Sequence, residues 1–540
     1  MRLVSILALV LFCTVTVEAQ QTIKRPKLIV GIVVDQMRWD YLYRFYDRYD
    51  ANGGFKRMLN QGFTCENTLI PYTPTYTGCG HSSIYTGSVP AINGITGNYW
   101  WDRDQMRSVY CTEDKTVNTV GSATSAGKQS PRNMLTTTIC DELRIATNFK
   151  SKVVGISIKD RGGILPAGHS ANAAYWYDGG VGKWITSTYY MNELPKWVND
   201  FNAQKLVDKY YEKGWNTLYP INTYTLSTAD EKSHEAKTLG GNKFPYDMKA
   251  YMGKDYGKVS TTPMGNTLTA EFAKATLVAE QLGADDITDF LAVSFSSPDY
   301  IGHTFGPNSV EAEDGFLRLD KELGSFLDFL DAKVGKGQYT VFLSADHGVA
   351  HTPEYMTENK MPGGRVFMSD ITKQLNIALN EKFNITPVVV YDDNYQFGLN
   401  HPKIDSAKLD AEDIIEWIVT RMSKDSNIAR IFSLEELNEV PLPGTVRNML
   451  NNGYYKRRSG DIQFLLKPNY IDAWSNTGTT HGLWNPYDTH IPLLWYGWGI
   501  KQGKTNRETY MTDIAPTIAA LLRIQMPNGN VGQVITEVLK

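Results

Sequence analysis

The run KLIVGIVV at Lys27–Val34, followed at once by Asp35, decides the fold class of this chain. A continuous β-branched run of this length is typical of a strand that is buried on both faces, as the strands of parallel sheets are. Comparable runs recur as KVVGISI at Lys152–Ile158, FLAVSF at Phe290–Phe295, YTVFLS at Tyr339–Ser344 and IPLLWY at Ile491–Tyr496. We therefore predict five buried strands, and a titratable residue follows shortly after four of them.

Helical patterns lie between these runs. Thr267–Leu282 and Glu313–Val334 carry apolar residues at spacings of three and four. Strands that alternate with helices predict an α/β fold of three layers, with a mostly parallel central sheet and helices on both faces. Because ligands of such sheets bind beyond the carboxyl ends of the strands, we expect the titratable residues there to be functional.

Two regions depart from this rhythm. Residues from about 170 to 260 are rich in Tyr, Trp and Asn and show weak periodicity. Residues from about 365 to 465 contain a strand of their own at Pro387–Tyr391 and an amphipathic helix at Ala411–Met422. We interpret both regions as insertions into a single domain that covers residues 20–540.

The composition is that of an ordinary globular protein. Hydrophobic residues make up 42% and charged residues 21% of the 540 positions, which argues against disorder. The formal net charge is −4 and no basic patch stands out. Nucleic-acid binding is therefore not expected.

The start of the chain predicts export. Arg2 supplies a positive charge, Leu3–Val17 is largely apolar, and Val17–Ala19 offers the small residues that a signal peptidase reads. We expect residues 1–19 to be a signal peptide and the protein to be periplasmic or secreted. No other run approaches the roughly 20 apolar residues of a membrane span, so no transmembrane segment is expected.

The cysteines that follow residue 19 have no CxxC spacing, so a cysteine-based zinc site is not expected. They are Cys65, Cys79, Cys111 and Cys140. Four cysteines in an oxidising compartment allow three disulfide pairings, and the sequence leaves the choice open.

Several short motifs could bind metal. Asp299 and His303 are four residues apart in PDYIGH, so one helical turn would point both side chains the same way. Asp346-His347-Gly348 follows a predicted strand, and Asp35 ends the first one. His481 is a lone histidine. Taken singly, each of these is as easily a surface coincidence or a helix cap.

Together, however, the motifs resemble the alkaline phosphatase superfamily, within it the nucleotide pyrophosphatase/phosphodiesterase-like branch, and most of all the PafA-type alkaline phosphatases. The matching pieces, in family order, are VVDQMR (Val33–Arg38), PTYTGCGHSSIYTGSVPAINGITGN (Pro74–Asn98), PDYIGHTFGP (Pro298–Pro307), SADHG (Ser344–Gly348), THG (Thr480–Gly482) and TDIAPTIAALLRIQMPNGNVG (Thr512–Gly532). The resemblance spans nearly the whole chain apart from the two insertions.

The resemblance implies two zinc ions per chain. One would be held by Asp299, His303 and His481. The other would be held by Asp35, Asp346 and His347, with the oxygen of Thr77 as a further ligand. Imidazole and carboxylate ligands suit Zn²⁺, although they also accept Mn²⁺.

The resemblance also implies that Thr77 is the nucleophile, since its spacing to Gly80, His81 and Asn98 matches the family. Metal coordination is one way to activate a threonine hydroxyl, which is a poor nucleophile at neutral pH. A sulfatase would need Cys79 to continue as C-x-P-x-R, and this continuation is absent. We interpret His81 as structural.

The substrate class rests on three more residues. Asn98 aligns with the amide that donates to a phosphoryl oxygen, and Lys159 and Arg161 in IKDR resemble the Lys/Arg pair of the PafA-type enzymes. Such a pair can bind the extra charged oxygen of a monoester dianion. The resemblance thus predicts an alkaline phosphatase that hydrolyses small phosphate monoesters through a covalent phosphothreonine. We expect the protein to be a monomer, although the sequence does not reveal the oligomeric state. A phosphodiesterase or nucleotide pyrophosphatase of the same fold is the closest alternative, and a binding protein without catalysis is a second.

Overall fold

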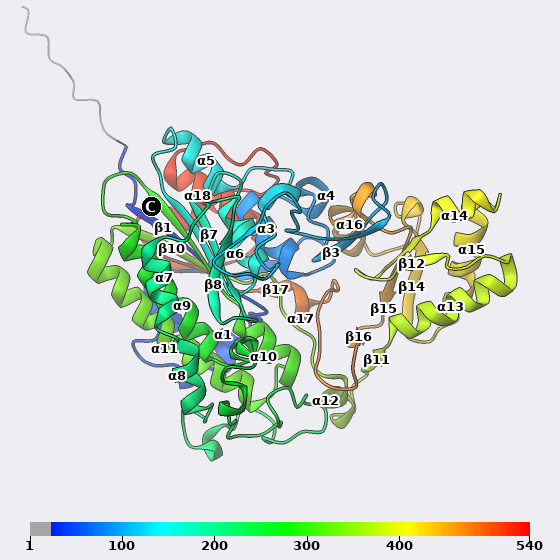
Figure 1. Cartoon of the computed structure of the whole chain (residues 1–540), viewed down its shortest axis with the longest axis horizontal. Helices are drawn as coiled ribbons and strands as arrows, with labels where there is room; N and C mark the ends of the chain where they lie inside the picture. The colour runs from blue at the N-terminus through cyan, green and yellow to red at the C-terminus, as the bar shows by residue number, and fades with distance from the viewer. Residues whose placement is uncertain (1–22) are drawn as a thin grey trace, which may run out of the picture.

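The computed structural model describes residues 23–540 of the chain. The expected signal peptide, residues 1–19, lies outside the described residues. Within residues 23–540, no helix combines the length and the apolar character that crossing a membrane requires. The chain forms a large body built around one sheet and a smaller lobe beside it (Figure 1).

The large body contains an 11-stranded sheet in the order β17-β2-β18-β10-β1-β9-β6-β7-β8-β5, with β19 beside β2. Its strands are β1 (Leu28–Val34), β2 (Phe63–Leu69), β5 (Thr119–Val120), β6 (Val153–Ser157), β7 (Ala173–Asp178), β8 (Lys183–Ser187), β9 (Asp289–Phe295), β10 (Tyr339–Ser344), β17 (His490–Ile491), β18 (Leu493–Gly497) and β19 (Gly503–Tyr510).

The middle of this sheet is parallel, as the sequence predicts. β1 pairs in parallel with β10 on one side and with β9 on the other, and β6 continues the parallel order from β9 to β7. All seven residues of β1 are buried, which explains its uninterrupted apolar run. The register sets Val33 beside both Ser344 and Ser294, so the strands end at one edge. The mostly parallel α/β fold is therefore confirmed.

The direction of β18 differs from the prediction. The run Ile491–Tyr496 forms most of this strand, but β18 lies antiparallel to β10, with Leu493 opposite Ser344. A strand that is buried on both faces has the same apolar pattern in either direction. The sequence therefore predicts where the strand lies in the chain but not its direction in the sheet, which depends on the segments that connect it.

Helices cover both faces of the sheet (Figure 1). One face carries α3 (Thr77–Thr86), α5 (Ile139–Ala146), α6 (Asp160–Ala167) and α18 (Ile514–Leu522), and the other carries α2 (Gly54–Gln61), α9 (Met264–Ala279) and α11 (Val310–Leu330). The two predicted helices correspond to α9 and α11. α11 gives way to a π-helical turn at Asp331–Gly335, so the regular helix is shorter than its apolar pattern.

Shorter elements connect these layers. They are α1 (Tyr41–Arg44), α4 (Pro90–Asn93), β3 (Tyr99–Asp102), β4 (Arg107–Tyr110), α10 (Ser297–Phe305), α12 (Pro353–Glu358) and α17 (Pro486–Thr489). Among them, α10 follows β9 directly and so begins at the carboxyl edge of the sheet.

The region from about 170 to 260 is tied closely to the large body. Its first part forms β7 and β8, which belong to the central sheet. Next come α7 (Lys196–Ala203) and α8 (Leu206–Lys213), both of which contact α9, and Trp215 and Tyr246 join the main hydrophobic core. The sequence of β7, AAYWYD, is aromatic rather than aliphatic, which is why composition alone assigns it to an insertion.

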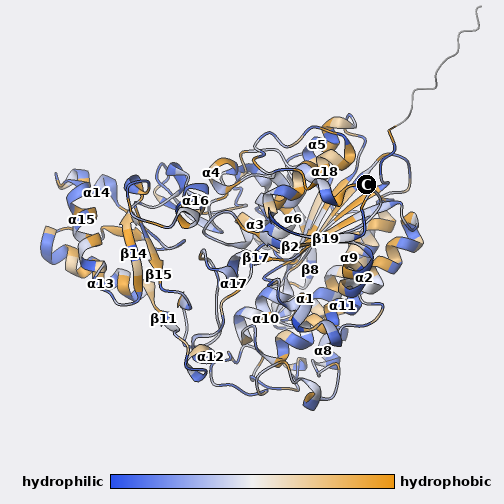
Figure 2. Cartoon of the chain, turned by 180° about the vertical axis from the view of Figure 1, so that it is seen from behind, coloured by the Kyte–Doolittle hydropathy of each residue, from blue (hydrophilic) through white to orange (hydrophobic). Residues whose placement is uncertain are grey.

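The smaller lobe comes mainly from the region that the sequence analysis marks at about 365–465. It contains β11 (Gly364–Val366), α13 (Met368–Phe383), β12 (Val389–Tyr391), β13 (Gln396–Leu399), α14 (His401–Ser406), α15 (Ala411–Met422), β14 (Ile428–Ser433), α16 (Gly444–Gly453), β15 (Ile462–Leu466) and β16 (Tyr470–Asp472). α15 has the bounds that its amphipathic pattern predicts. The lobe has its own four-stranded sheet and its own core, seen in Figure 2 as apolar strands between polar helices.

The four cysteines that the structure describes are free thiols, and all are buried. Burial raises the pKa of the Cys65 thiol to about 12. None of the three possible pairings is therefore formed, and the two cores hold the fold without a disulfide.

Candidate active site

Three of the expected ligands follow strands of the parallel core. Asp35 comes directly after β1, while Asp346 and His347 come just after β10. All three residues are fully buried. Because β1 and β10 are paired neighbours that end at the same edge, their ends bring these side chains together.

Asp299 and His303 lie on α10, which runs over nine residues where the sequence predicts a single turn. Residues four apart share one face of a helix, and His303 Nε2 is 3.2 Å from Asp299 Oδ1. His481 lies in the loop between β16 and α17, and its Nε2 is 3.6 Å from the same oxygen. The lone histidine of the sequence therefore meets the D-x3-H pair in space.

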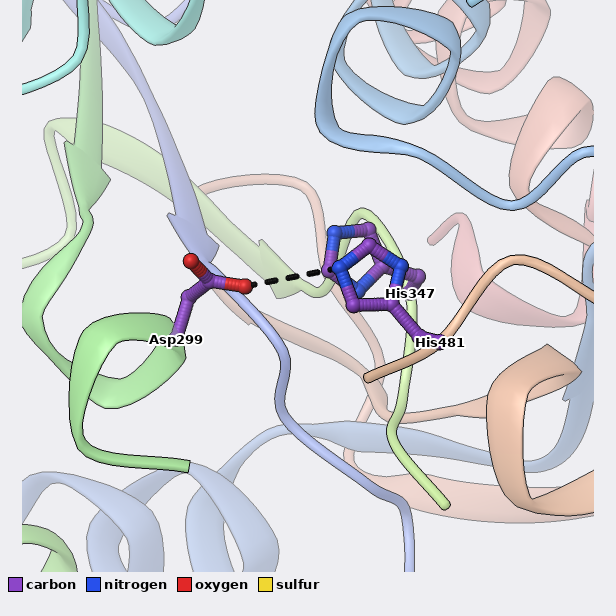
Figure 3. Close-up of side chains that lie close together, drawn as sticks. All are labelled: Asp299, His347 and His481. Carbon is purple, nitrogen blue, oxygen red and sulfur yellow. Dashed lines mark ion pairs between the residues drawn. The ribbon is translucent and has the colours of Figure 1, made fainter. Parts of the chain in front are cut away.

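The donor atoms form two groups that share His347. The donor atoms of Asp35, Asp346 and His347 all lie within 4.8 Å of one another, and so do those of Asp299, His347 and His481. In Figure 3, Asp299 faces the stacked rings of His347 and His481, whose centroids are 3.5 Å apart. The ring of His303 stands beside them, 5.1 Å from that of His481. All six expected ligands thus lie in one place, but the second group contains His347 where the resemblance implies His303.

The three imidazoles are held in the same way. In each ring, Nδ1 contacts a backbone carbonyl oxygen. His303 contacts that of Thr479 at 2.8 Å, His347 that of Gly348 at 3.0 Å, and His481 that of Thr75 at 2.7 Å. A carbonyl can only accept, so Nδ1 donates, and Nε2 of each ring is turned into the site. Metal-binding histidines are oriented in this manner. A cation placed between these nitrogens and the neighbouring carboxylate oxygens would be attracted by both.

Burial acts strongly on these groups. Burial, followed by the charges of Asp299 and Asp346, raises the pKa of Asp35 well above its usual range. Burial also lowers the pKa of His347 to about 3, so its ring stays neutral, the form that binds metal. Asp35 Oδ1 and Asp346 Oδ2 are buried without a hydrogen-bond partner among the described residues. Buried carboxylate oxygens beside neutral imidazoles are a donor set that fits Zn²⁺.

Lys159 joins the two groups. Its Nζ is 2.7 Å from Asp35 Oδ2 and 2.6 Å from Asp299 Oδ2. Burial alone would lower the pKa of Lys159, but the charges of Asp299 and Asp35 outweigh it and raise the pKa. The resemblance implies an ammonium that faces a phosphoryl oxygen, whereas the structure places it between two expected metal ligands. Buried carboxylates attract the nearest cation, which accounts for this position.

Thr77 is the first residue of α3, a helix of ten residues, and it is buried. Its Oγ1 lies 3.4 Å from His347 Nε2 and 3.5 Å from the guanidinium of Arg161. The N–H groups of a first helical turn lack partners inside the helix and favour an anion. Gly78 N–H donates to Asn98 Oδ1 at 2.9 Å, which leaves the NH₂ group of Asn98 as a donor. A hydroxyl, a guanidinium and an amide thus converge where α3 begins.

Tyr110 orients Arg161, and the sequence offers no signal for it. Arg161 donates to the Tyr110 hydroxyl at 2.9 Å, and that hydroxyl donates to Asp160 at 2.5 Å. Tyr110 ends β4 and Arg161 lies in the first turn of α6, so only the fold brings them together. This chain of bonds holds the guanidinium toward Thr77.

Gln36 is the second residue that sequence reasoning missed. Its side-chain amide donates to Asp299 at 2.8 Å, and its backbone N–H donates to Asp346 at 3.1 Å, so it contacts one carboxylate of each group. Its φ of 64° is unusual for a residue with a side chain. Strained backbone of this kind often occurs at functional sites.

The sequence predicts a structural role for His81. It is buried on α3, one turn after Thr77, and its Nδ1 is 2.9 Å from the Thr77 carbonyl. Its Nε2 lies 2.8 Å from the hydroxyl of Ser294. Its contacts bind α3 to β9, while Nδ1 also lies 3.4 Å from Asp346 Oδ2.

Gly80 allows α3 to approach the strand end that carries Asp346. A Cβ at this position would lie 2.5 Å from Asp346 Cβ and 2.6 Å from its Cα, distances at which packed atoms must move. Gly80→Ala is therefore expected to destabilise the protein by about 1–3 kcal/mol, measured by urea unfolding. Gly241→Ala is the control, since nothing lies within 4 Å of a Cβ there. Equal stability of the two variants would show that α3 can shift freely.

Known proteins resemble this chain over nearly its whole length. The family described as type I phosphodiesterase / nucleotide pyrophosphatase matches residues 29–487. The chain is 54% identical to a protein named alkaline phosphatase PhoV from Synechococcus elongatus, over 96% of this chain and 94% of that one. It is 52% identical to a Myroides odoratus protein named calcium-transporting ATPase, over 99% and 98% of the two chains.

A third relative is also available as a structure. Alkaline phosphatase PafA from Elizabethkingia meningoseptica is 51% identical over 96% of each chain. The crystal structure of wild-type PafA matches the fold with a TM-score of 0.94 at 50% identity, and covers 96% of this chain and 100% of that chain. The similarity therefore includes the large body and the smaller lobe.

Proposed function

The chain belongs to the type I phosphodiesterase / nucleotide pyrophosphatase family, and from this premise we propose that it is a zinc-dependent alkaline phosphatase. In this proposal it hydrolyses phosphate monoesters through a covalent phosphothreonine at Thr77. The observation that carries it is the pair of carboxylate–imidazole groups beside the Thr77 hydroxyl. The names of PhoV and PafA support phosphatase activity.

Two zinc ions fit the donor set described above. Asp35, Asp346 and His347 would hold one, and Asp299, His303 and His481 the other. When bound, such a pair of cations supplies Lewis acidity and lowers the pKa of the hydroxyl and water oxygens that react. Gln36 donates to Asp346 of the first group and to Asp299 of the second, and would hold these two ligands at a fixed separation.

The chain's own residues then position the phosphoryl group. The Thr77 hydroxyl releases its proton to solvent and Oγ1 forms the new bond to phosphorus, while the bond to the leaving oxygen breaks on the opposite side and that oxygen takes up a proton from water. Asn98, Arg161 and the start of α3 donate to the oxygens of the transferring group, whose charge is spread over three atoms. Water attack on the phosphothreonine releases phosphate and restores the Thr77 hydroxyl. Two successive inversions leave the configuration at phosphorus retained.

A preference for monoesters follows from positive charge near Thr77. A monoester dianion carries one more charged oxygen than a diester, and Arg161 is held 3.5 Å from Thr77 Oγ1 by its bond to Tyr110. Lys159 is a second buried cation at the same edge. A phosphodiesterase of the same fold is the alternative, and it would gain little from this pair.

Metal removal tests the proposal. A chelator is expected to lower the hydrolysis of phenyl phosphate strongly, and added zinc is expected to restore it, because the carboxylates otherwise repel one another and the phosphate. The assay should run phenyl phosphate, diphenyl phosphate and ATP in parallel, since one close relative is named as an ATPase. Faster hydrolysis of the diester than of the monoester would favour a phosphodiesterase. Activity that the chelator leaves unchanged would rule out the proposed metal site.

We also propose that the protein is exported to the periplasm or secreted and acts as a monomer on small phosphate esters. The apolar start of the chain supports export. Cell fractionation with N-terminal sequencing of the exported form would check the expected cleavage before Gln20.

A further inference from the structure

Trp474 is exposed beside the candidate active site. It is 73% exposed, more than any other large hydrophobic side chain in the described part of the chain. Its ring centroid lies 5.7 Å from that of His303, at an interplanar angle of 52°. A single exposed tryptophan needs no explanation by itself. This one is notable because its neighbour is an expected metal ligand.

The segment around Trp474 is held in place from the side of the smaller lobe. Ala473 N–H donates to the Val366 carbonyl at 2.7 Å. Arg365, which pairs with both carboxylate oxygens of Glu354, donates to three carbonyls after the tryptophan, those of Ser475, Thr477 and Gly478. The backbone on both sides of Trp474 is therefore held by hydrogen bonds.

The other end of the segment is bonded to α10. Thr479 N–H donates to the His303 carbonyl at 3.0 Å, and His303 Nδ1 donates to the Thr479 carbonyl at 2.8 Å. This reciprocal pair links the loop to His303 itself. The loop that carries Trp474 is therefore bonded directly to one of the expected metal ligands.

The site opens to solvent on the same side. The side chain of His303 is 23% exposed, whereas those of His481 and His347 are 4% and 0% exposed. Thr77 approaches from the closed side, 3.4 Å from His347 Nε2. In an in-line displacement the leaving group departs opposite the nucleophile, which here means past His303.

We propose that Trp474 forms a leaving-group subsite that stacks on planar, apolar groups, so that phosphate monoesters of aromatic alcohols bind better than those of small alkyl alcohols. This proposal rests on the proposed function. An indole offers a large rigid face, and aromatic pairs attract beyond the area that they bury. The proposed contact of the indole is with the leaving group alone.

Binding to the zinc-loaded protein tests this subsite without turnover. Isothermal titration calorimetry would compare phenylphosphonate, methylphosphonate and inorganic phosphate on the wild type and on Trp474→Ala. We expect the variant to bind phenylphosphonate about two- to tenfold more weakly, the range that an aromatic pair supplies, and the other two ligands as before. Trp474→Phe should retain most of the preference.

Phe149→Ala, at a side chain that is 55% exposed on the loop after α5, is the matched control and should change nothing. Equal loss for all three ligands, or no loss for phenylphosphonate, would overturn the subsite. Failure of the proposed function would look different, because the wild type would then neither bind phosphate nor hydrolyse phenyl phosphate.

Discussion

Thr77→Ala is expected to lower the turnover of phosphate monoesters by about 10⁴-fold or more, the scale seen when a catalytic nucleophile is removed. The hydroxyl lies at the start of α3, 3.4 Å from His347 Nε2. Among the described residues, no other hydroxyl hydrogen-bonds this nitrogen. The six expected metal ligands are untouched. Steady-state assays with phenyl phosphate, together with the metal content of the variant, provide the measurement.

Two further variants sharpen this experiment. Thr77→Ser keeps an oxygen at the same place and should retain measurable turnover. Thr86→Ala removes a hydroxyl from the other end of α3, where it bonds the Ser82 carbonyl, and should stay close to the wild type in turnover. Robust hydrolysis by a metal-loaded Thr77→Ala protein would take the nucleophilic role away from this residue.

Replacing both Lys159 and Arg161 with alanine is expected to lower monoester hydrolysis by about 10²–10³-fold or more, because the change removes Arg161 as a donor in the transition state and Lys159 as a second buried cation at the same edge. Diester hydrolysis should fall much less, since a diester lacks the additional charged oxygen. Rates for phenyl phosphate and diphenyl phosphate, measured on the same preparations, give the ratio directly.

Metal content must be followed here as well, because Lys159 contacts Asp35 and Asp299. Lys196→Ala is the control. It removes an exposed cation whose ion pair with Asp200 contributes little, and it should leave both rates unchanged. An equal fall for both esters in the double variant would contradict the proposed monoester preference.

Local patterns were sufficient for much of the fold. β1 is buried at every position, and its run of β-branched residues predicts this burial. α15 begins and ends where its amphipathic pattern does, and Asp299 and His303 share a helical face as their spacing requires. These features depend on residues close together in the chain, which is why the sequence predicts them.

Other features depend on residues far apart. The direction of β18 and the membership of β7 in the central sheet follow from pairing partners that no local pattern identifies. Gln36 and Tyr110 have ordinary neighbours in sequence and acquire their contacts only in the fold.

The sequence by itself determined which residue types stand after which strands, and so which chemistry this protein can support. Only the tertiary structure decided that His481 meets Asp299, that the ammonium of Lys159 lies between two carboxylates, and that Trp474 stands beside His303. The physical reason is that side-chain identity and periodicity act over a few residues, whereas the charge, burial and contacts of a site are sums over segments that only packing brings together.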